Sequence, residues 1–173
     1  MSTTMPAAAP CLSEDDLHTV RDIAHRWRDV PGGLLPALHA VQHALGCVPD
    51  AAVPILAEAA GRSRAEVHGV ITYYQHFRRT PAGRVLVQVC QAEACQACGA
   101  DALMAHAEQR LGCRSHETRA DGEVTLEPVY CLGLCASSPA IQVGDALHAR
   151  VTPQRLDELM AEAGVATVQE ASA

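Results

Sequence analysis

The spacing of apolar residues changes in character near residue 80. Before that point, apolar side chains recur every three or four residues, as on the buried face of an amphipathic helix. Helices are therefore predicted at about residues 13–27, 34–45, 51–60 and 64–74. Pro81-Ala82-Gly83 is the expected boundary of this helical part, because proline and glycine interrupt regular structure.

Local residue patterns mark the starts of several of these helices. Two serines, each followed three residues later by an acidic residue, have the spacing of a capping box, which satisfies backbone N–H groups of a first turn. The two pairs are Ser13 with Asp16 and Ser63 with Glu66. Asp50 is expected to cap the third helix, and Gly46 is expected to end the second with a positive φ.

Beyond residue 83 the pattern is that of a mixed sheet. Apolar and polar residues alternate over segments predicted as strands at 84–90, 114–118, 123–130, 140–143 and 147–151. Helices are predicted at 99–111 and 153–163. The order β-α-β-β-β-β-α indicates a small sheet with helices packed on it, so the predicted fold class is α+β.

Charge and composition limit the function classes. The formal net charge is −7, and after residue 80 the acidic residues are twice as numerous as the arginines. Phe, Trp and Tyr make up only 3% of the chain, which leaves little capacity for base stacking. We therefore expect no nucleic-acid partner, since polyanions bind basic surfaces.

The two ends of the chain and its hydropathy predict a cytoplasmic protein. The first residues lack the basic and apolar regions of a signal peptide, and no apolar run is long enough to span a bilayer. We therefore expect no direct membrane insertion. The segments 1–12 and 166–173 are expected to be disordered.

Four cysteines carry the chemistry of the chain. Cys90 ends one predicted strand and Cys95 follows it, while Cys131 ends another strand and Cys135 follows. Four convergent thiolates in a reducing compartment usually hold a metal or an iron–sulfur cluster. The spacings C-x4-C and C-x3-C are longer than zinc knuckles and favour a two-iron cluster.

The remaining cysteines leave other interpretations open. Cys95 and Cys98 form a C-x-x-C between a strand and a helix, where a thiol-disulfide oxidoreductase would carry its dithiol. Cys98 could also replace Cys95 as a ligand, although we interpret it as a bystander. A zinc-stapled regulatory or DNA-binding module is a third interpretation. Three further cysteines are expected to fill cores or to be exposed by chance: Cys11, Cys47 and Cys113.

Several segments resemble the two-iron ferredoxin-like subunit of NADH dehydrogenases. Residues 33–42 and 64–74 are similar to its N-terminal helical part. The two cysteine pairs, with Cys131-Leu132-Gly133 and Pro139-Ala140, are similar to its thioredoxin-like [2Fe–2S] domain. Members occur in respiratory complex I, in NAD-reducing hydrogenases and in soluble NAD-dependent formate dehydrogenases. Residues 89–96 and 125–133 are most similar to the gamma subunit of the formate dehydrogenases, whereas Cys98 departs from the family pattern.

The resemblance implies a domain organisation and one cofactor. Residues 13–80 would be a helical bundle that docks onto a partner, and residues 81–165 a thioredoxin-like [2Fe–2S] ferredoxin domain. One [2Fe–2S] cluster is expected, with four ligands. These are Cys90, Cys95, Cys131 and Cys135.

The resemblance also implies a carrier that is not catalytic alone. Such a carrier exchanges single electrons with the FMN of a partner iron–sulfur subunit that binds NAD. In a formate dehydrogenase, a large subunit with a molybdenum or tungsten pterin centre completes the complex. The chain itself has no glycine-rich nucleotide-binding fingerprint, which fits this role.

Overall fold

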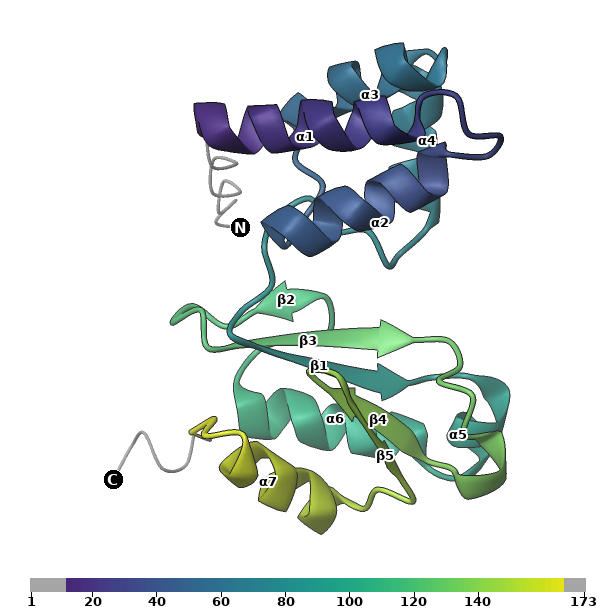
Figure 1. Cartoon of the computed structure of the whole chain (residues 1–173). Helices are drawn as coiled ribbons and strands as arrows, with labels where there is room; N and C mark the ends of the chain where they lie inside the picture. The colour runs from purple at the N-terminus through teal and green to yellow at the C-terminus, as the bar shows by residue number, and fades with distance from the viewer. Residues whose placement is uncertain (1–11, 167–173) are drawn as a thin grey trace, which may run out of the picture. The chain divides into compact units, whose positions relative to one another are not determined.

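The computed structural model describes residues 12–166, which divide into two compact units (Figure 1). The helical unit ends at Pro81 and the sheet unit begins at Ala82. The segments predicted to be disordered, 1–12 and 166–173, lie outside the described residues except for residues 12 and 166.

The helical unit contains a helix at each of the four predicted places. They are α1 (Glu14–Trp27), α2 (Leu34–Leu45), α3 (Val53–Ala60) and α4 (Arg64–Tyr73). Their apolar faces meet in one core, in which Val20, Leu38 and Val67 are fully buried. Periodic burial of this kind is what stabilises short helices, which are marginal in isolation.

The helix ends follow the local patterns with one exception. Both capping boxes are confirmed, and Gly46 adopts a positive φ at the end of α2. The prediction that Asp50 caps the third helix is wrong. Asp50 lies in a 3₁₀ turn (Asp50–Ala52) before α3, and its carboxylate binds the guanidinium of Arg79. The Asp50 side chain therefore binds Arg79, 29 residues away in the sequence, and does not cap the neighbouring helix as the local pattern predicts.

The sheet unit has five strands in the order β2-β3-β1-β4-β5. The strands are β1 (Val85–Cys90), β2 (Glu117–Thr118), β3 (Val124–Val129), β4 (Ala140–Val143) and β5 (Ala146–Ala149). The pair β1 and β3 is parallel, and all other pairs are antiparallel. Three helices accompany them, α5 (Glu93–Ala97), α6 (Ala100–Leu111) and α7 (Pro153–Glu162).

Three details of this unit differ from the prediction. The short helix α5 was not expected, the strand expected at 114–118 shortens to β2, and β5 begins and ends earlier than 147–151. The predicted hairpin turn at Gly144-Asp145 is confirmed, because Val143 pairs with Ala146 across it. The positive φ of Gly144 suits such a two-residue turn.

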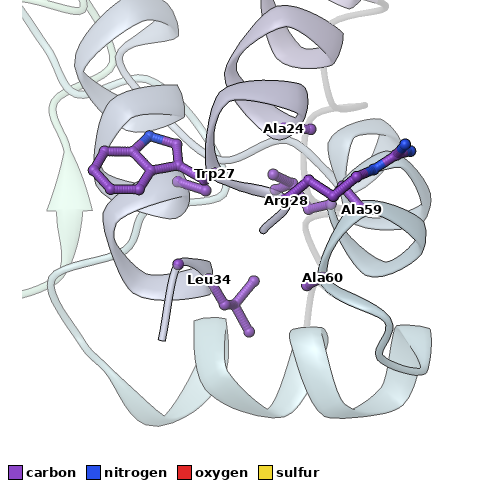
Figure 2. Close-up of a pocket in the computed structure, with 9 residues that line it drawn as sticks. Ala24, Trp27, Arg28, Leu34, Ala59 and Ala60 are labelled. Carbon is purple, nitrogen blue, oxygen red and sulfur yellow. The ribbon is translucent and has the colours of Figure 1, made fainter. Parts of the chain in front are cut away.

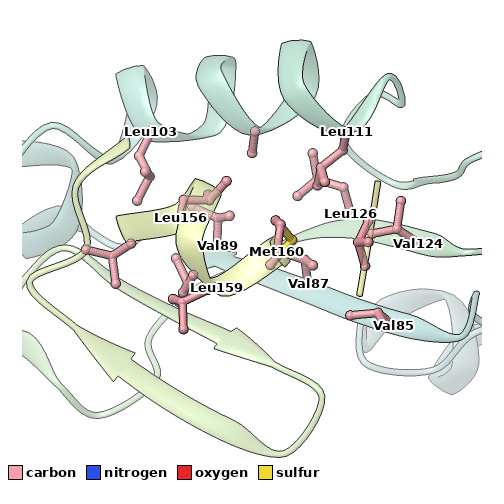
Figure 3. Packing of buried hydrophobic residues seen from close by; sticks show 14 of the residues in the cluster. Val85, Val87, Val89, Leu103, Leu111, Val124, Leu126, Leu156, Leu159 and Met160 are labelled. Carbon is pink, nitrogen blue, oxygen red and sulfur yellow. The ribbon is translucent and has the colours of Figure 1, made fainter. Parts of the chain in front are cut away.

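The helices α6 and α7 pack on one face of the sheet (Figures 1 and 3). Val85, Val87 and Val89 alternate along β1 and all point into this core, as the two-residue period of a strand requires. On the other face, the side chain of Gln88 donates to Glu127 of β3 at 3.1 Å. The core therefore holds β1 and β3 side by side. Because the two strands are parallel, both end at the same edge of the sheet.

Candidate functional site

Parallel pairing brings the two cysteine-bearing strand ends to one edge of the sheet. Cys90, the last residue of β1, lies opposite Val129, the last residue of β3. Cys131 follows two residues later. The prediction that these strand ends converge is confirmed, and the convergence follows from the register of β1 on β3.

The helix α5 returns the chain so that Cys95 reaches Cys90. Its first turn closes with a hydrogen bond from the Gln96 N–H to the Ala92 carbonyl, at 2.9 Å. Cys95 is buried, and its thiol interacts with the thiol of Cys90. Its Sγ lies 3.4 Å from the Ser138 hydroxyl. The unexpected helix thus pairs the first two thiols.

The second thiol pair lies in the loop after β3. The Sγ atoms of Cys131 and Cys135 are 3.6 Å apart, and both residues are exposed. Cys131 has a φ of 105°, a conformation that costs a non-glycine residue about 1–3 kcal/mol and recurs at functional sites. Gly133, with a φ of 80°, turns its N–H toward the Cys131 sulfur at 3.4 Å. The backbone of this loop thus places the two sulfur atoms side by side and directs an N–H group at one of them.

The surroundings of Cys90 favour its thiolate. Burial raises the pKa of the Cys90 thiol, but hydrogen bonds outweigh burial and the net shift is downward. The donors are the backbone N–H groups of Ala92, Leu132 and Cys131, together with the Cys95 thiol. Cys90 therefore receives hydrogen bonds from both cysteine segments.

The opposite shift is found at Cys135. Its pKa is raised, first by the hydrogen bond with Cys131 and then by the negative charge of the other thiolates. Cys95 and Cys90 contribute to this repulsion. Four thiols that repel one another when ionised form a site that a cationic metal centre would stabilise.

The fit to a two-iron centre can be judged from the donors themselves. Among the described residues, no three His, Cys, Asp or Glu side chains are grouped as ligands of a single metal ion. The thiols instead form two pairs, Cys90 with Cys95 and Cys131 with Cys135. Two pairs of thiolates, with N–H groups directed at the sulfur atoms, suit two irons bridged by sulfide.

The other cysteines take different places. Cys98 is exposed and lines a cleft of about 440 Å³ with residues that include Gly99, Pro139 and Arg150. Cys47 and Cys113 are buried, and burial raises the pKa of each thiol, so both are kept protonated within cores. Cys11 lies outside the described residues.

The sequence predicts that Gly133 lets backbone N–H groups approach the sulfur atoms, and its N–H does point at Cys131. The side chain that sequence reasoning missed is Ser138. The Ser138 hydroxyl donates to the Cys135 carbonyl at 3.0 Å and contacts the Cys95 sulfur, so it connects the two cysteine segments. Its position just before the resembling Pro139-Ala140 was the only indication in the sequence. The N–H groups directed at Cys90 carry no side-chain signature at all.

The core of the helical unit holds one small pocket among those found in the described residues, beside an open hollow of about 400 Å³ between α1 and α3. Figure 2 shows a pocket among Ala24, Trp27, Leu34 and Ala59, where α1, α2 and α3 meet. Its volume is about 10 Å³, roughly the space of one water molecule. The pocket is a packing gap and not a ligand site.

Comparison with known proteins decides the family. The family model described as thioredoxin-like [2Fe–2S] ferredoxin matches residues 20–164, which include both thiol pairs. The chain belongs to the thioredoxin-like [2Fe–2S] ferredoxin family. This ferredoxin therefore carries one [2Fe–2S] cluster, and the predicted α+β fold with a thioredoxin-like domain is confirmed.

The relatives of this ferredoxin include components of NADH-quinone oxidoreductases. The E subunit of the Pseudomonas aeruginosa enzyme is 34% identical over 149 residues, which cover 86% of this chain and 90% of the relative. The E 2 subunit of the Rhizobium meliloti enzyme is 38% identical over 137 residues, 79% of this chain and 82% of the relative.

A solved structure shares the fold. A chain of an NAD⁺-reducing [NiFe]-hydrogenase in the air-oxidised state matches with a TM-score of 0.64 and 24% identity. The match covers 80% of this ferredoxin and 24% of the longer hydrogenase chain. Across residues 12–166, no helix combines the length and apolarity that a bilayer crossing requires.

Proposed function

We propose that this ferredoxin is the [2Fe–2S] electron-transfer subunit of a NAD-dependent formate dehydrogenase. The main support is that two pairs of cysteine thiols lie at the edge where β1 and β3 both end. Backbone N–H groups donate hydrogen bonds to their sulfur atoms. The four cysteines are the ligands in this proposal, and Cys98 is not one of them.

Each thiol pair has a distinct role in this proposal. When bound, the cluster supplies transfer of one electron at a time. Cys90 and Cys95 hold the buried side, where N–H donors offset added negative charge. Cys131 and Cys135 hold the exposed side, which faces the partner because electron transfer requires close approach.

The dithiol alternative gains less support from the geometry. A thiol-disulfide oxidoreductase needs Cys95 and Cys98 to act together. Cys95 is buried and its thiol interacts with Cys90, whereas Cys98 is exposed and lines a cleft that Cys95 does not line. The dithiol interpretation also gives no role to Cys131 and Cys135, whose sulfur atoms are adjacent.

The proposed complex contains two further subunits. One binds FMN and NAD and exchanges single electrons with this chain, and residues 13–80 dock onto it. The other holds a molybdenum or tungsten pterin centre that oxidises formate. The segments 91–94 and 125–128 support the formate branch, because they resemble the gamma subunit of the formate dehydrogenases. Both segments lie close to ligand cysteines in the sequence, and the Gln91 N–H donates to the Val129 carbonyl.

The relatives point to two other complexes, and the experiment must distinguish these from a formate dehydrogenase. The similar sequences are subunits of NADH-quinone oxidoreductases, and a chain of an NAD⁺-reducing hydrogenase shares the fold. Deleting the gene should abolish NAD-linked formate oxidation in cell extracts. Intact formate oxidation with loss of quinone-linked NADH oxidation would assign the chain to complex I, and loss of hydrogen-dependent NAD reduction would assign it to a hydrogenase.

A further inference from the structure

A run of aromatic rings covers the end of α4 and the loop that follows it. Tyr73 packs edge-on against Tyr74, with ring centroids 5.2 Å apart, and Tyr74 is 6.2 Å from Phe77. Phe77 in turn contacts His39 of α2 at 5.0 Å and His76 at 5.8 Å. These five residues are called the aromatic patch below.

The aromatic patch is exposed in a chain that has few aromatic residues. Tyr73 is 79% exposed and Tyr74 is 44% exposed, while Phe77, which contacts Tyr74, is buried. The chain has one Phe, one Trp and three Tyr, so the patch holds three of its five such residues. Large apolar rings left in water are costly unless a partner covers them, and tyrosine is enriched at interface hot spots.

A buried glutamine holds the patch in place. The Gln42 side chain donates to the His76 carbonyl at 2.8 Å and accepts from the Arg78 N–H at 2.7 Å. The Arg78 carbonyl accepts a further hydrogen bond from the Val48 N–H at 2.7 Å. Gln42 is only 6% exposed, so this clamp is shielded from water. The loop is thereby fixed before any partner binds, which lowers the entropic cost of binding.

The charge around the patch is opposite to that of the chain. No Asp or Glu occurs in residues 30–49 or 67–92, although the formal net charge is −7. These two segments include the whole patch and also His43, Arg78 and Arg79. His43 is exposed one helical turn after His39, on the same side of α2. Asp50 lies just beyond these segments and pairs with Arg79. The patch itself thus carries no carboxylate and is followed in the chain by the cation Arg78, so its electrostatic complement is a surface rich in carboxylates.

We infer that the aromatic patch anchors the helical unit on the flavin-bearing subunit, on an acidic surface with a recess that receives Tyr73. This inference rests on the proposed function, which supplies that partner. The patch lies within the helical unit alone, so its role is separate from the ligands of the cluster.

The test uses the full-length, cluster-loaded chain and the purified FMN- and NAD-binding subunit. Affinity is measured by titration calorimetry at two salt concentrations. Tyr73→Ala should weaken binding on the order of tenfold or more, because truncated hot-spot residues have effects of this size. His43→Glu should weaken binding at the lower salt concentration and reduce the salt dependence of the affinity. Two variants of exposed residues serve as matched controls, Val30→Ala and His25→Glu, and should bind like the wild type.

Each other outcome has a distinct meaning. If the wild type does not bind the flavin-bearing subunit, the proposed function is wrong. If the wild type binds and Tyr73→Ala binds equally well, only the anchoring role is wrong. The anchoring role is also wrong if Tyr73→Ala instead disrupts a dimer of this chain or its binding to a single-stranded oligonucleotide. Unchanged far-UV circular dichroism and thermal unfolding of Tyr73→Ala show that its helical unit has folded.

Discussion

Replacing Ser138 by alanine should lower the reduction potential of the cluster. The Ser138 hydroxyl lies 3.4 Å from the Cys95 sulfur and donates to the Cys135 carbonyl. As a thiol, Cys95 donates to the Ser138 hydroxyl, whose single hydrogen goes to the Cys135 carbonyl. An iron-bound Cys95 thiolate can only accept, so the Ser138 hydroxyl hydrogen must turn from that carbonyl to the Cys95 sulfur when the cluster is bound. A donor to a ligand sulfur stabilises the reduced, more negative cluster, and its loss makes reduction harder.

The size of the shift follows from the value of one hydrogen bond. A net contribution of about 1 kcal/mol corresponds to about 40 mV for a one-electron couple. The potential is measured by redox titration monitored by EPR. Ser137→Ala is the matched control, since the Ser137 hydroxyl has no hydrogen bond within the described part of the chain. A Ser138→Ala potential that stays within about 10 mV of wild type, or rises, contradicts the reasoning, whereas Ser138→Thr should restore it.

Four further predictions concern composition, ligands, stability and the two units. The purified protein should contain iron and inorganic sulfide in equal amounts, with a potential near roughly −400 mV, and stoichiometric zinc without sulfide would refute this. Serine at any of the four ligand cysteines should abolish or alter the EPR spectrum, while Cys98→Ser should leave it unchanged; the reverse behaviour of Cys95 and Cys98 would overturn the ligand set. Leu126→Ala, in the fully buried core, should cost about 2–5 kcal/mol in urea unfolding, against less than about 0.5 kcal/mol for the exposed Leu147→Ala. A chain that begins at residue 82 should still bind the cluster but should co-purify poorly with the flavin-bearing subunit, and full retention in the complex would contradict the docking role.

Local sequence patterns correctly predicted those structural features that depend on interactions between nearby residues. The capping box of Ser63 and Glu66 joins residues three apart, and the Gly144-Asp145 turn closes on itself, so both could be predicted from the sequence. The convergence of the cysteine-bearing strands could be predicted as well, because strand ends in a sheet share edges.

The features that were missed depend on long-range contacts. Asp50 binds Arg79, and Gln42 clamps a loop more than 30 residues away, so no window of sequence reveals either contact. The helix α5 has only five residues and no side-chain cap, so it carries little intrinsic signal. Its formation coincides with the return of Cys95 to Cys90, which is a property of the folded site.

The strand order has a consequence for biosynthesis. The central strand β1, with Cys90 at its end, leaves the ribosome before both of its neighbours, β3 and β4. About 40 residues separate Cys90 from Cys131, which at 5–20 residues per second is a delay of roughly 2–8 s. During that interval the nascent chain displays one thiol pair and an unpaired strand. Assembly of a four-cysteine cluster must therefore wait until β3 has been translated and docked, which makes metallation a late step in the maturation of this protein.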